Sequence, residues 1–132
     1  MIKKVFDFDC NLDKGLNYYK NNGFCIFKNV FNSNNLEKLI YKIENIVDYQ
    51  LKDLEVKSKF KNLDEKIIFL AKKNDEYRKR LYETIQKLPH LMNLTSNKKL
   101  FKFFKNLNIS FPLIRSSQIR MDLPQDKRFL IP

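Results

Sequence analysis

The fold is decided by the stretch YYKNNGFCIFKNVFNSNNLEKL, residues 18–39. Its Asn21-Asn22-Gly23 segment is typical of a helix C-terminus, because glycine readily adopts the left-handed conformation that ends helices. We therefore expect a first helix from about Leu12 to Asn21. The apolar run Phe24–Phe27 follows directly and predicts a short buried strand.

A long amphipathic helix is expected after this strand. Asn32, Ser33 and Asn34 offer side-chain oxygens that can accept hydrogen bonds from the free amides at a helix start. The helix is predicted from about Asn34 to Leu54. Its apolar residues recur in steps of three and four, which places them on one face. They are Leu36, Leu39, Ile40, Ile43, Ile46, Val47, Leu51 and Leu54.

A third helix is predicted from about Leu63 to Leu88, where apolar residues again recur with helical spacing. Asp64 and Glu65 fall in its first turn, where the helix dipole favours negative charge. The stretch Lys73–Arg80, KNDEYRKR, is expected to be an exposed charged face of this helix. Pro89 is expected to end it, because proline cannot continue a helix.

A fourth helix is predicted from about Ser96 to Leu107, capped by Thr95 or Ser96. The middle of this helix is the stretch KKLFKFFK, residues 98–105, which mixes basic and aromatic residues. One interpretation is an ordinary amphipathic helix with a core side of Leu100, Phe101, Phe103, Phe104 and Leu107 and a solvent side of lysines. The other is a face for an anionic membrane surface or a nucleic acid.

The hydrophobic period changes from 3.6 to 2 between Ser116 and Leu123, which predicts a strand. One side carries Ile119, Met121 and Leu123, and the other carries Gln118, Arg120 and Asp122. Pro124–Lys127 has turn chemistry. Phe129–Ile131 then begins a second strand.

These elements predict the α+β class and one domain over residues 1–132. We expect residues 1–110 to be mainly helical and residues 111–132 to form a β-hairpin. The apolar run Phe129–Ile131 ends the chain with nothing after it to complete a sheet, so we expect the front part of a longer fold. A piece of this kind should self-associate through its uncovered apolar edge.

The composition excludes several functional classes. Gly15 and Gly23 are the only glycines, so a P-loop or a dinucleotide-binding glycine motif is absent. Cys10 and Cys25 are too few for a disulfide framework, and His90 is the only histidine, so a four-ligand zinc site lacks partners. We expect two reduced thiols in a cytoplasmic protein, and no apolar run is long enough to span a membrane.

The net charge of +11 is carried by residues 57–132, because residues 1–56 hold 8 basic and 8 acidic side chains. A basic half suggests nucleic acid or an anionic surface as a partner. However, the chain has 21 Lys and only 5 Arg, whereas phosphate and base recognition favour the arginine fork. We therefore do not expect nucleic acid to be the partner.

Three segments resemble phytanoyl-CoA dioxygenase-like (PhyH-like) proteins in the same order. Residues 18–39 resemble the opening of these proteins, with a helix, "NGF", a strand, "NVF" and a long helix. Residues 88–107, LPHLMNLTSNKKLFKFFKNL, are similar to a later segment that leads into a short helix. Residues 116–132, SSQIRMDLPQDKRFLIP, resemble the first strands of the double-stranded β-helix, or jelly roll, of the family.

The resemblance implies a non-haem oxygenase that uses Fe(II), 2-oxoglutarate and O₂ to hydroxylate a small molecule or an acyl-CoA-like substrate. The family binds iron with a His-x-Asp pair and a distant His, and the pair follows the part that resembles residues 129–132. No metal ligand or catalytic residue is therefore carried over, and this chain alone should be inactive. The resemblance places Gln118, Arg120 and Asp122 on the inner face of the barrel, as candidates for the substrate or 2-oxoglutarate pocket. Arg120 has the geometry to pair with a carboxylate.

Two alternatives to this N-terminal part of a dioxygenase are a ligand-free relative and a basic helical module. The basic module would bind nucleic acid or an anionic surface. It predicts that seven cations join in one continuous positive face: Arg78, Lys79, Arg80, Lys98, Lys99, Lys102 and Lys105.

Overall fold

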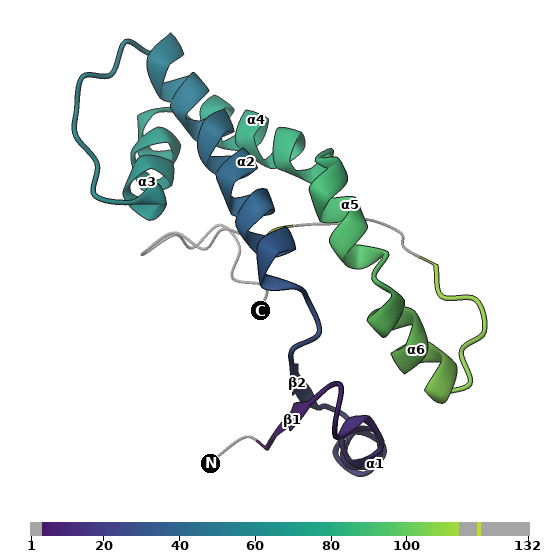
Figure 1. The fold of residues 1–132 in the computed structure, drawn as a ribbon. Helices are drawn as coiled ribbons and strands as arrows, with labels where there is room; N and C mark the ends of the chain where they lie inside the picture. The colour runs from purple at the N-terminus through teal and green to yellow at the C-terminus, as the bar shows by residue number, and fades with distance from the viewer. Residues whose placement is uncertain (1–3, 114–118, 120–132) are drawn as a thin grey trace.

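The structure is a computed structural model that describes residues 4–113 and residue 119. Within these residues it is mainly helical, with one small sheet (Figure 1). The elements in chain order are β1 (Val5–Asp7), α1 (Leu12–Asn22), β2 (Ile26–Lys28), α2 (Ser33–Asp53), α3 (Leu63–Lys73), α4 (Asp75–Gln86), α5 (Pro89–Thr95) and α6 (Lys98–Asn106). The α+β prediction is confirmed at this level. The predicted strands in residues 116–123 and 129–131 lie outside the described residues, apart from Ile119.

The sheet is a parallel pair, in which Phe6 of β1 lies opposite Phe27 of β2. The strand predicted over Phe24–Phe27 is present, but it begins two residues later, at Ile26. Strand β1 was not predicted, because its three residues carry no period of their own. It becomes a strand only through its pairing with β2 across the α1 crossover.

The two glycines allow α1 to end before β2 and to pack closely against it. Gly23 ends α1 as predicted, with φ of 74° and its N–H donating to the Tyr19 carbonyl. Gly15 is buried inside α1 and faces the Phe27 ring so closely that a Cβ atom there would overlap it. The helix therefore approaches β2 at a distance that only glycine permits.

The first core is rich in aromatic residues and joins α6 to the N-terminal elements. Phe8, Leu12 and Leu16 are buried, and Phe27, Val30, Phe103 and Leu107 pack against them. The Phe27 ring lies 5.3 Å from that of Phe8 and 5.8 Å from that of Phe103, each edge to face. We call β1, α1, β2 and α6 the aromatic unit.

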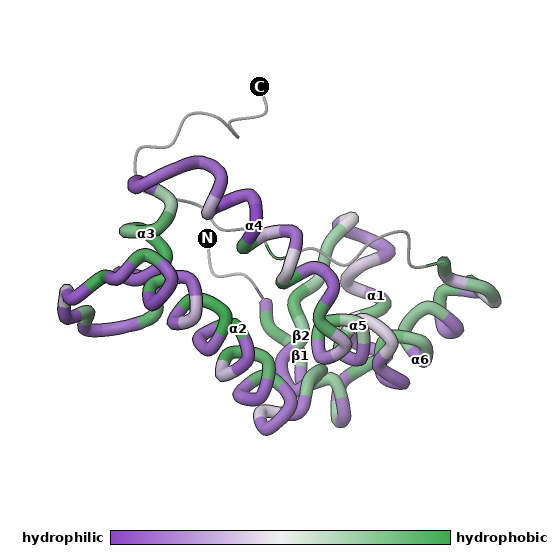
Figure 2. The backbone as a smooth tube through the Cα atoms, turned by 90° about the horizontal axis from the view of Figure 1, so that it is seen from above, coloured by the Kyte–Doolittle hydropathy of each residue, from purple (hydrophilic) through white to green (hydrophobic). Residues whose placement is uncertain are grey.

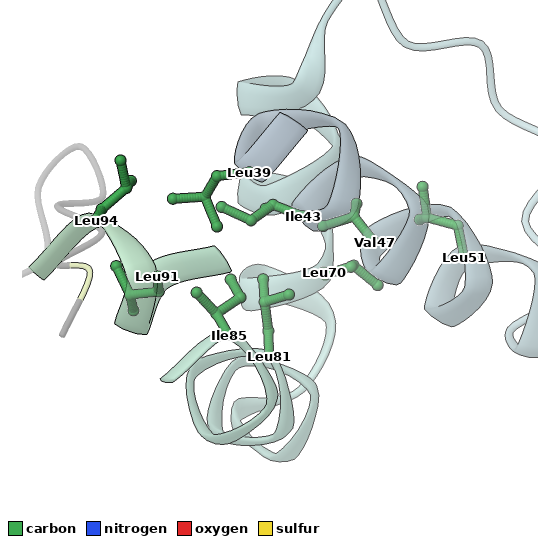
Figure 3. Packing of buried hydrophobic residues seen from close by; sticks show 9 residues of the cluster. All are labelled: Leu39, Ile43, Val47, Leu51, Leu70, Leu81, Ile85, Leu91 and Leu94. Atoms are coloured by element: carbon green, nitrogen blue, oxygen red, sulfur yellow. The ribbon is translucent and has the colours of Figure 1, made fainter. Parts of the chain in front are cut away.

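The second core is aliphatic and lies among α2, α3, α4 and α5, which we call the aliphatic unit. Figure 3 shows the side chains of α2 on one side and those of α4 and α5 on the other, with Leu70 of α3 beside Val47. Its buried members are Leu39, Ile43, Val47, Leu51, Leu70, Leu81, Ile85, Leu91 and Leu94. In Figure 2, hydrophobic and hydrophilic residues alternate around the coils of α2, as its predicted stripe requires.

The single helix predicted over residues 63–88 is wrong, because the chain forms two helices that meet at Asn74. Asn74 is extended, with φ of −160° and ψ of 136°, and its side chain accepts a hydrogen bond from the Glu76 amide at 2.9 Å. Lys72 and Lys73 end α3, and Asp75 and Glu76 begin α4. This charge order suits the C-terminus of one helix dipole and the N-terminus of the next.

Two further helix starts differ from the prediction. Helix α4 ends at Gln86, before the predicted end at Leu88, and Pro89 is the first residue of α5. Proline suits this position because its amide would be unpaired there in any case. The cap of α6 is Asn97 and not Thr95 or Ser96; its Oδ1 accepts from the Lys99 amide at 2.7 Å.

Candidate functional site

The three predicted pocket residues, Gln118, Arg120 and Asp122, lie outside the described residues. Their neighbour Ile119 is described, and it is half-buried against the aliphatic core. Ile119 belongs to the apolar side of the predicted 116–123 strand. At this one position, the apolar side therefore contacts the helices. The roles of the three polar residues stay predictions.

The expectation that Lys73–Arg80 is an exposed charged face is wrong at Arg78. This side chain is 6% exposed and lies on the buried side of α4 with Leu81 and Ile85. Spacings of three and four residues align these positions on one helix face. The Arg78 guanidinium lies 5.9 Å from the centre of the Tyr82 ring, a cation–π contact.

The continuous positive face expected for a basic module is not formed by its seven cations. Arg78 is buried, and Lys99 is held by two oxygens of the aromatic unit. The Lys99 Nζ lies 2.7 Å from Asp9 Oδ2 and 2.7 Å from the Asn29 carbonyl oxygen. Helix α5 also lies between α4 and α6 (Figure 1).

The described residues contain no group of three or more His, Cys, Asp or Glu side chains that could hold a metal ion. Cys10 and Cys25 are both free thiols. Burial raises the pKa of the Cys25 thiol, which disfavours the reactive thiolate. His90 is the second residue of α5.

Two charged side chains, Asp7 and Lys66, make the contacts that fix the geometry around the strands and the long helix. Asp7 accepts from Asn29 Nδ2 at 2.6 Å and from the Asp9 and Cys10 amides. The pKa of Asp7 is lowered, mainly by the hydrogen bond from Asn29. These bonds tie the end of β1 to the end of β2.

Lys66 plays the corresponding part in the aliphatic unit. Its Nζ lies 2.8 Å from Asp48 Oδ1 and 2.9 Å from Glu44 Oε1, and so it joins α3 to α2. The hydrogen bonds to Asp48 and Glu44 raise the pKa of Lys66. Both contacts join separate elements of the fold.

A groove of about 640 Å³ runs between α2 and α4. Ile46, Tyr77 and Leu88 are half-buried within it, and Tyr49 is 72% exposed beside it. The Gln50 Oε1 atom is buried there without a hydrogen-bond partner in the described part of the chain. The remaining lining residues are Lys42, Asn45, Asp53, Arg80, Glu83, Thr84 and Lys87.

The groove is lined by apolar, aromatic and charged side chains, including Asp53, Glu83 and Lys87. Arg80, one of its cations, is paired with Glu76 at 3.3 Å. Sequence reasoning missed the groove because it requires two helices that are far apart in the chain to lie side by side.

Comparisons of the chain with protein-family models, with curated proteins and with solved structures find no match. Among the described residues, no helix has both the length and the apolar character needed to cross a membrane.

Proposed function

We propose that residues 1–132 are the N-terminal part of an Fe(II)/2-oxoglutarate-dependent dioxygenase of the PhyH-like kind. The complete protein would hydroxylate a small molecule or an acyl-CoA-like substrate. In this proposal the helices described above support one side of a double-stranded β-helix, which the residues from Ser116 onward begin. The proposal rests on the resemblance and on the order of the elements in residues 18–39.

The element order is the observation that carries the proposal. The resemblance requires a helix, a glycine turn, a strand and then a long helix. These occur as α1, Gly23 in the left-handed conformation, β2 and α2. The Asn32 side chain accepts from the Asn34 amide at 2.9 Å, so the start of α2 also lies where the resemblance needs it.

The position of Ile119 supports the expected orientation of the pocket residues. Its side chain packs against the aliphatic core. If residues 116–123 alternate as their sequence predicts, then Gln118 and Arg120 face the opposite side, away from the helices. That side would be the interior of the proposed barrel.

The residues of this chain do not fit an iron site by themselves. The family's facial triad needs two histidines and a carboxylate, and the sequence contains only His90. The resemblance places the ligands after the segment that matches residues 129–132. We therefore derive no catalytic step from these 132 residues.

The deciding experiment is to read the coding sequence downstream of Pro132. The proposal expects an aromatic residue and a His-x-Asp motif in the same frame, with a second histidine further on. The protein made from that longer frame should convert 2-oxoglutarate to succinate when Fe(II) and O₂ are supplied. A stop codon directly after Pro132, or a longer frame without these ligands, would overturn the proposal.

The pocket assignment has its own test in the same longer protein. Arg120→Ala should lower kcat/KM for 2-oxoglutarate or for the substrate about 10- to 100-fold, since a hydrogen bond to a charged group contributes roughly 1.5–3 kcal/mol. Arg115→Ala, which alters another arginine outside the alternating 116–123 stretch, is the matched control. Equal kinetics for both variants would remove Arg120 from the pocket.

A further inference from the structure

The outward face of α6 differs from the expected lysine-only surface. Phe101, predicted to lie on the core side, is 42% exposed. Lys98, Lys102 and Lys105 precede or follow it by one, three or four residues and are exposed as well. On a helix the spacings of three and four residues place Lys98 and Lys105 on the same face as Phe101, with Lys102 at its edge.

Two contacts fix this orientation of α6. Phe103 and Leu107 pack against the buried core of the aromatic unit. Lys99, four residues before Phe103, reaches Asp9 and the Asn29 carbonyl. Because positions 99, 103 and 107 face inward, Phe101, Lys98 and Lys105 face away from the molecule. Lys102 lies at the edge of this face and lines a pocket together with Asp9 and Asp13.

The segment of the chain that carries this face has no acidic residue of its own. The sequence holds no Asp or Glu from residue 84 to residue 121, but it holds seven Lys and Arg there. The ion pairs recorded among the described residues use Lys99 of α6 and none of Lys98, Lys102 or Lys105. The three lysines are therefore available to an anionic partner.

Exposed apolar side chains follow the helix directly in the chain. Ile109 is 43% exposed, Phe111 is 90% exposed and Leu113 is 94% exposed. Soluble surfaces usually expose large apolar residues singly and not in a row. We call Lys98, Phe101, Lys102, Lys105, Ile109, Phe111 and Leu113 the basic–apolar surface.

We propose that the basic–apolar surface binds the surface of an anionic lipid bilayer. Lysines attract acidic headgroups, while neighbouring aromatic and aliphatic side chains enter the boundary between headgroups and acyl chains. A nucleic acid fits less well, because Ile109 and Leu113 have no ring to stack on bases and the surface has no arginine fork among its described residues. The inference rests on α6 and its continuation, and it does not depend on the proposed dioxygenase function.

The test is vesicle co-sedimentation of the chain with phosphatidylcholine alone and with phosphatidylcholine containing 30% phosphatidylserine. We expect binding to the anionic vesicles only, weakened by added salt. The triple variant Lys98→Gln/Lys102→Gln/Lys105→Gln should bind about 100-fold more weakly, since each lysine near such a membrane contributes about 1 kcal/mol. Circular dichroism would verify that the variant remains helical.

The matched control is Lys57→Gln/Lys59→Gln/Lys61→Gln, which removes the same charge from exposed lysines between α2 and α3. It should bind nearly as the unaltered chain does.

The chain contains no tryptophan, so Phe111→Trp adds a single fluorescent reporter, whose emission should shift to the blue with anionic vesicles.

Three outcomes would overturn the proposal. The first is an equal loss of binding in the two triple variants, which would show that net charge alone is responsible. The second is equal binding to phosphatidylcholine vesicles and to anionic vesicles, which would show that the surface is merely adhesive. The third is binding of a single-stranded oligonucleotide through Lys98, Lys102 and Lys105 without binding of vesicles, which would identify a nucleic acid as the partner.

Discussion

The aromatic unit and the aliphatic unit are stabilised in different ways. The aromatic unit has few buried residues, and its rings meet edge to face around Phe27. It depends on specific contacts, such as the close approach of Gly15 and the bonds of Asp7 and Lys99. The aliphatic unit has a larger core of leucine, isoleucine and valine, in which no one directional contact dominates. The comparison predicts that the stability of the aliphatic unit depends mainly on the volume of its core side chains. The stability of the aromatic unit should depend on the geometry of a few specific contacts.

The largest effect is expected from a cavity in the aliphatic unit. Leu70 is 0% exposed and lies beside Val47 in the centre of that core. Leu70→Ala should lower the free energy of unfolding by about 2–5 kcal/mol, because the removed methyl groups leave unfilled space. Chemical denaturation would measure it. Leu113→Ala, at a 94% exposed position, is the control and should change stability little.

The next effect tests the geometry of the aromatic unit. Gly15→Ala would stabilise an ordinary helix, since alanine is the better helix former by about 1 kcal/mol. Here the added Cβ overlaps Phe27, whose ring is held by Phe8 and Phe103. We expect a net loss of about 1–3 kcal/mol in thermal or chemical unfolding.

Gly23→Ala is the matched control for this overlap. No atom lies within 4 Å of a Cβ built there, but its φ is 74°. Its cost should be the left-handed strain alone, about 1–2 kcal/mol. If Gly15→Ala stabilised the protein, α1 and β2 would not approach as closely as described.

A smaller effect is expected where α6 joins the aromatic unit. Lys99→Met removes the bonds to Asp9 and to the Asn29 carbonyl. The pair is partly exposed, so the loss should be about 1 kcal/mol or less. The control is Lys102→Met, which has no recorded ion pair among the described residues. Hydrogen exchange should show faster opening of α6 in Lys99→Met only.

The smallest effects are pH-dependent and separate the two units. Asp7 has a lowered folded pKa, so its stabilisation is present above 3.8 and is lost as the pH falls through the folded value. Lys66 has a raised folded pKa, so its stabilisation is present below 10.5 and is lost as the pH rises through the folded value.

Unfolding measured across pH should show each difference in one variant. Asp7→Asn should reduce the acid dependence of stability and leave the alkaline dependence unchanged. Lys66→Met should reduce the alkaline dependence of stability. An acid limb that is identical in the unaltered chain and Asp7→Asn would contradict the contact with Asn29.

Local chemistry predicted several elements because the information is in neighbouring residues. The Gly23 turn, the Asn32 cap and the apolar stripe of α2 each depend on a few residues within one or two turns. The order Lys72-Lys73-Asn74-Asp75-Glu76 also indicates a break between two helices at Asn74. It was not predicted because the helical spacing of the apolar residues continues across it. The candidate pocket of Gln118, Arg120 and Asp122 comes from the sequence alone.

The sequence by itself determined α1 and α2, the Gly23 turn, the Asn32 cap and the apolar face of α2, since these follow from spacing along one segment. Only the tertiary structure decided that Val5–Asp7 is a strand, that Arg78 is buried and that Phe101 faces outward. Each of these depends on a partner far away in the chain, such as β2 for β1 or Asp9 for Lys99. Periodicity shows which residues share a face, but the packing of distant segments determines which face becomes the inside.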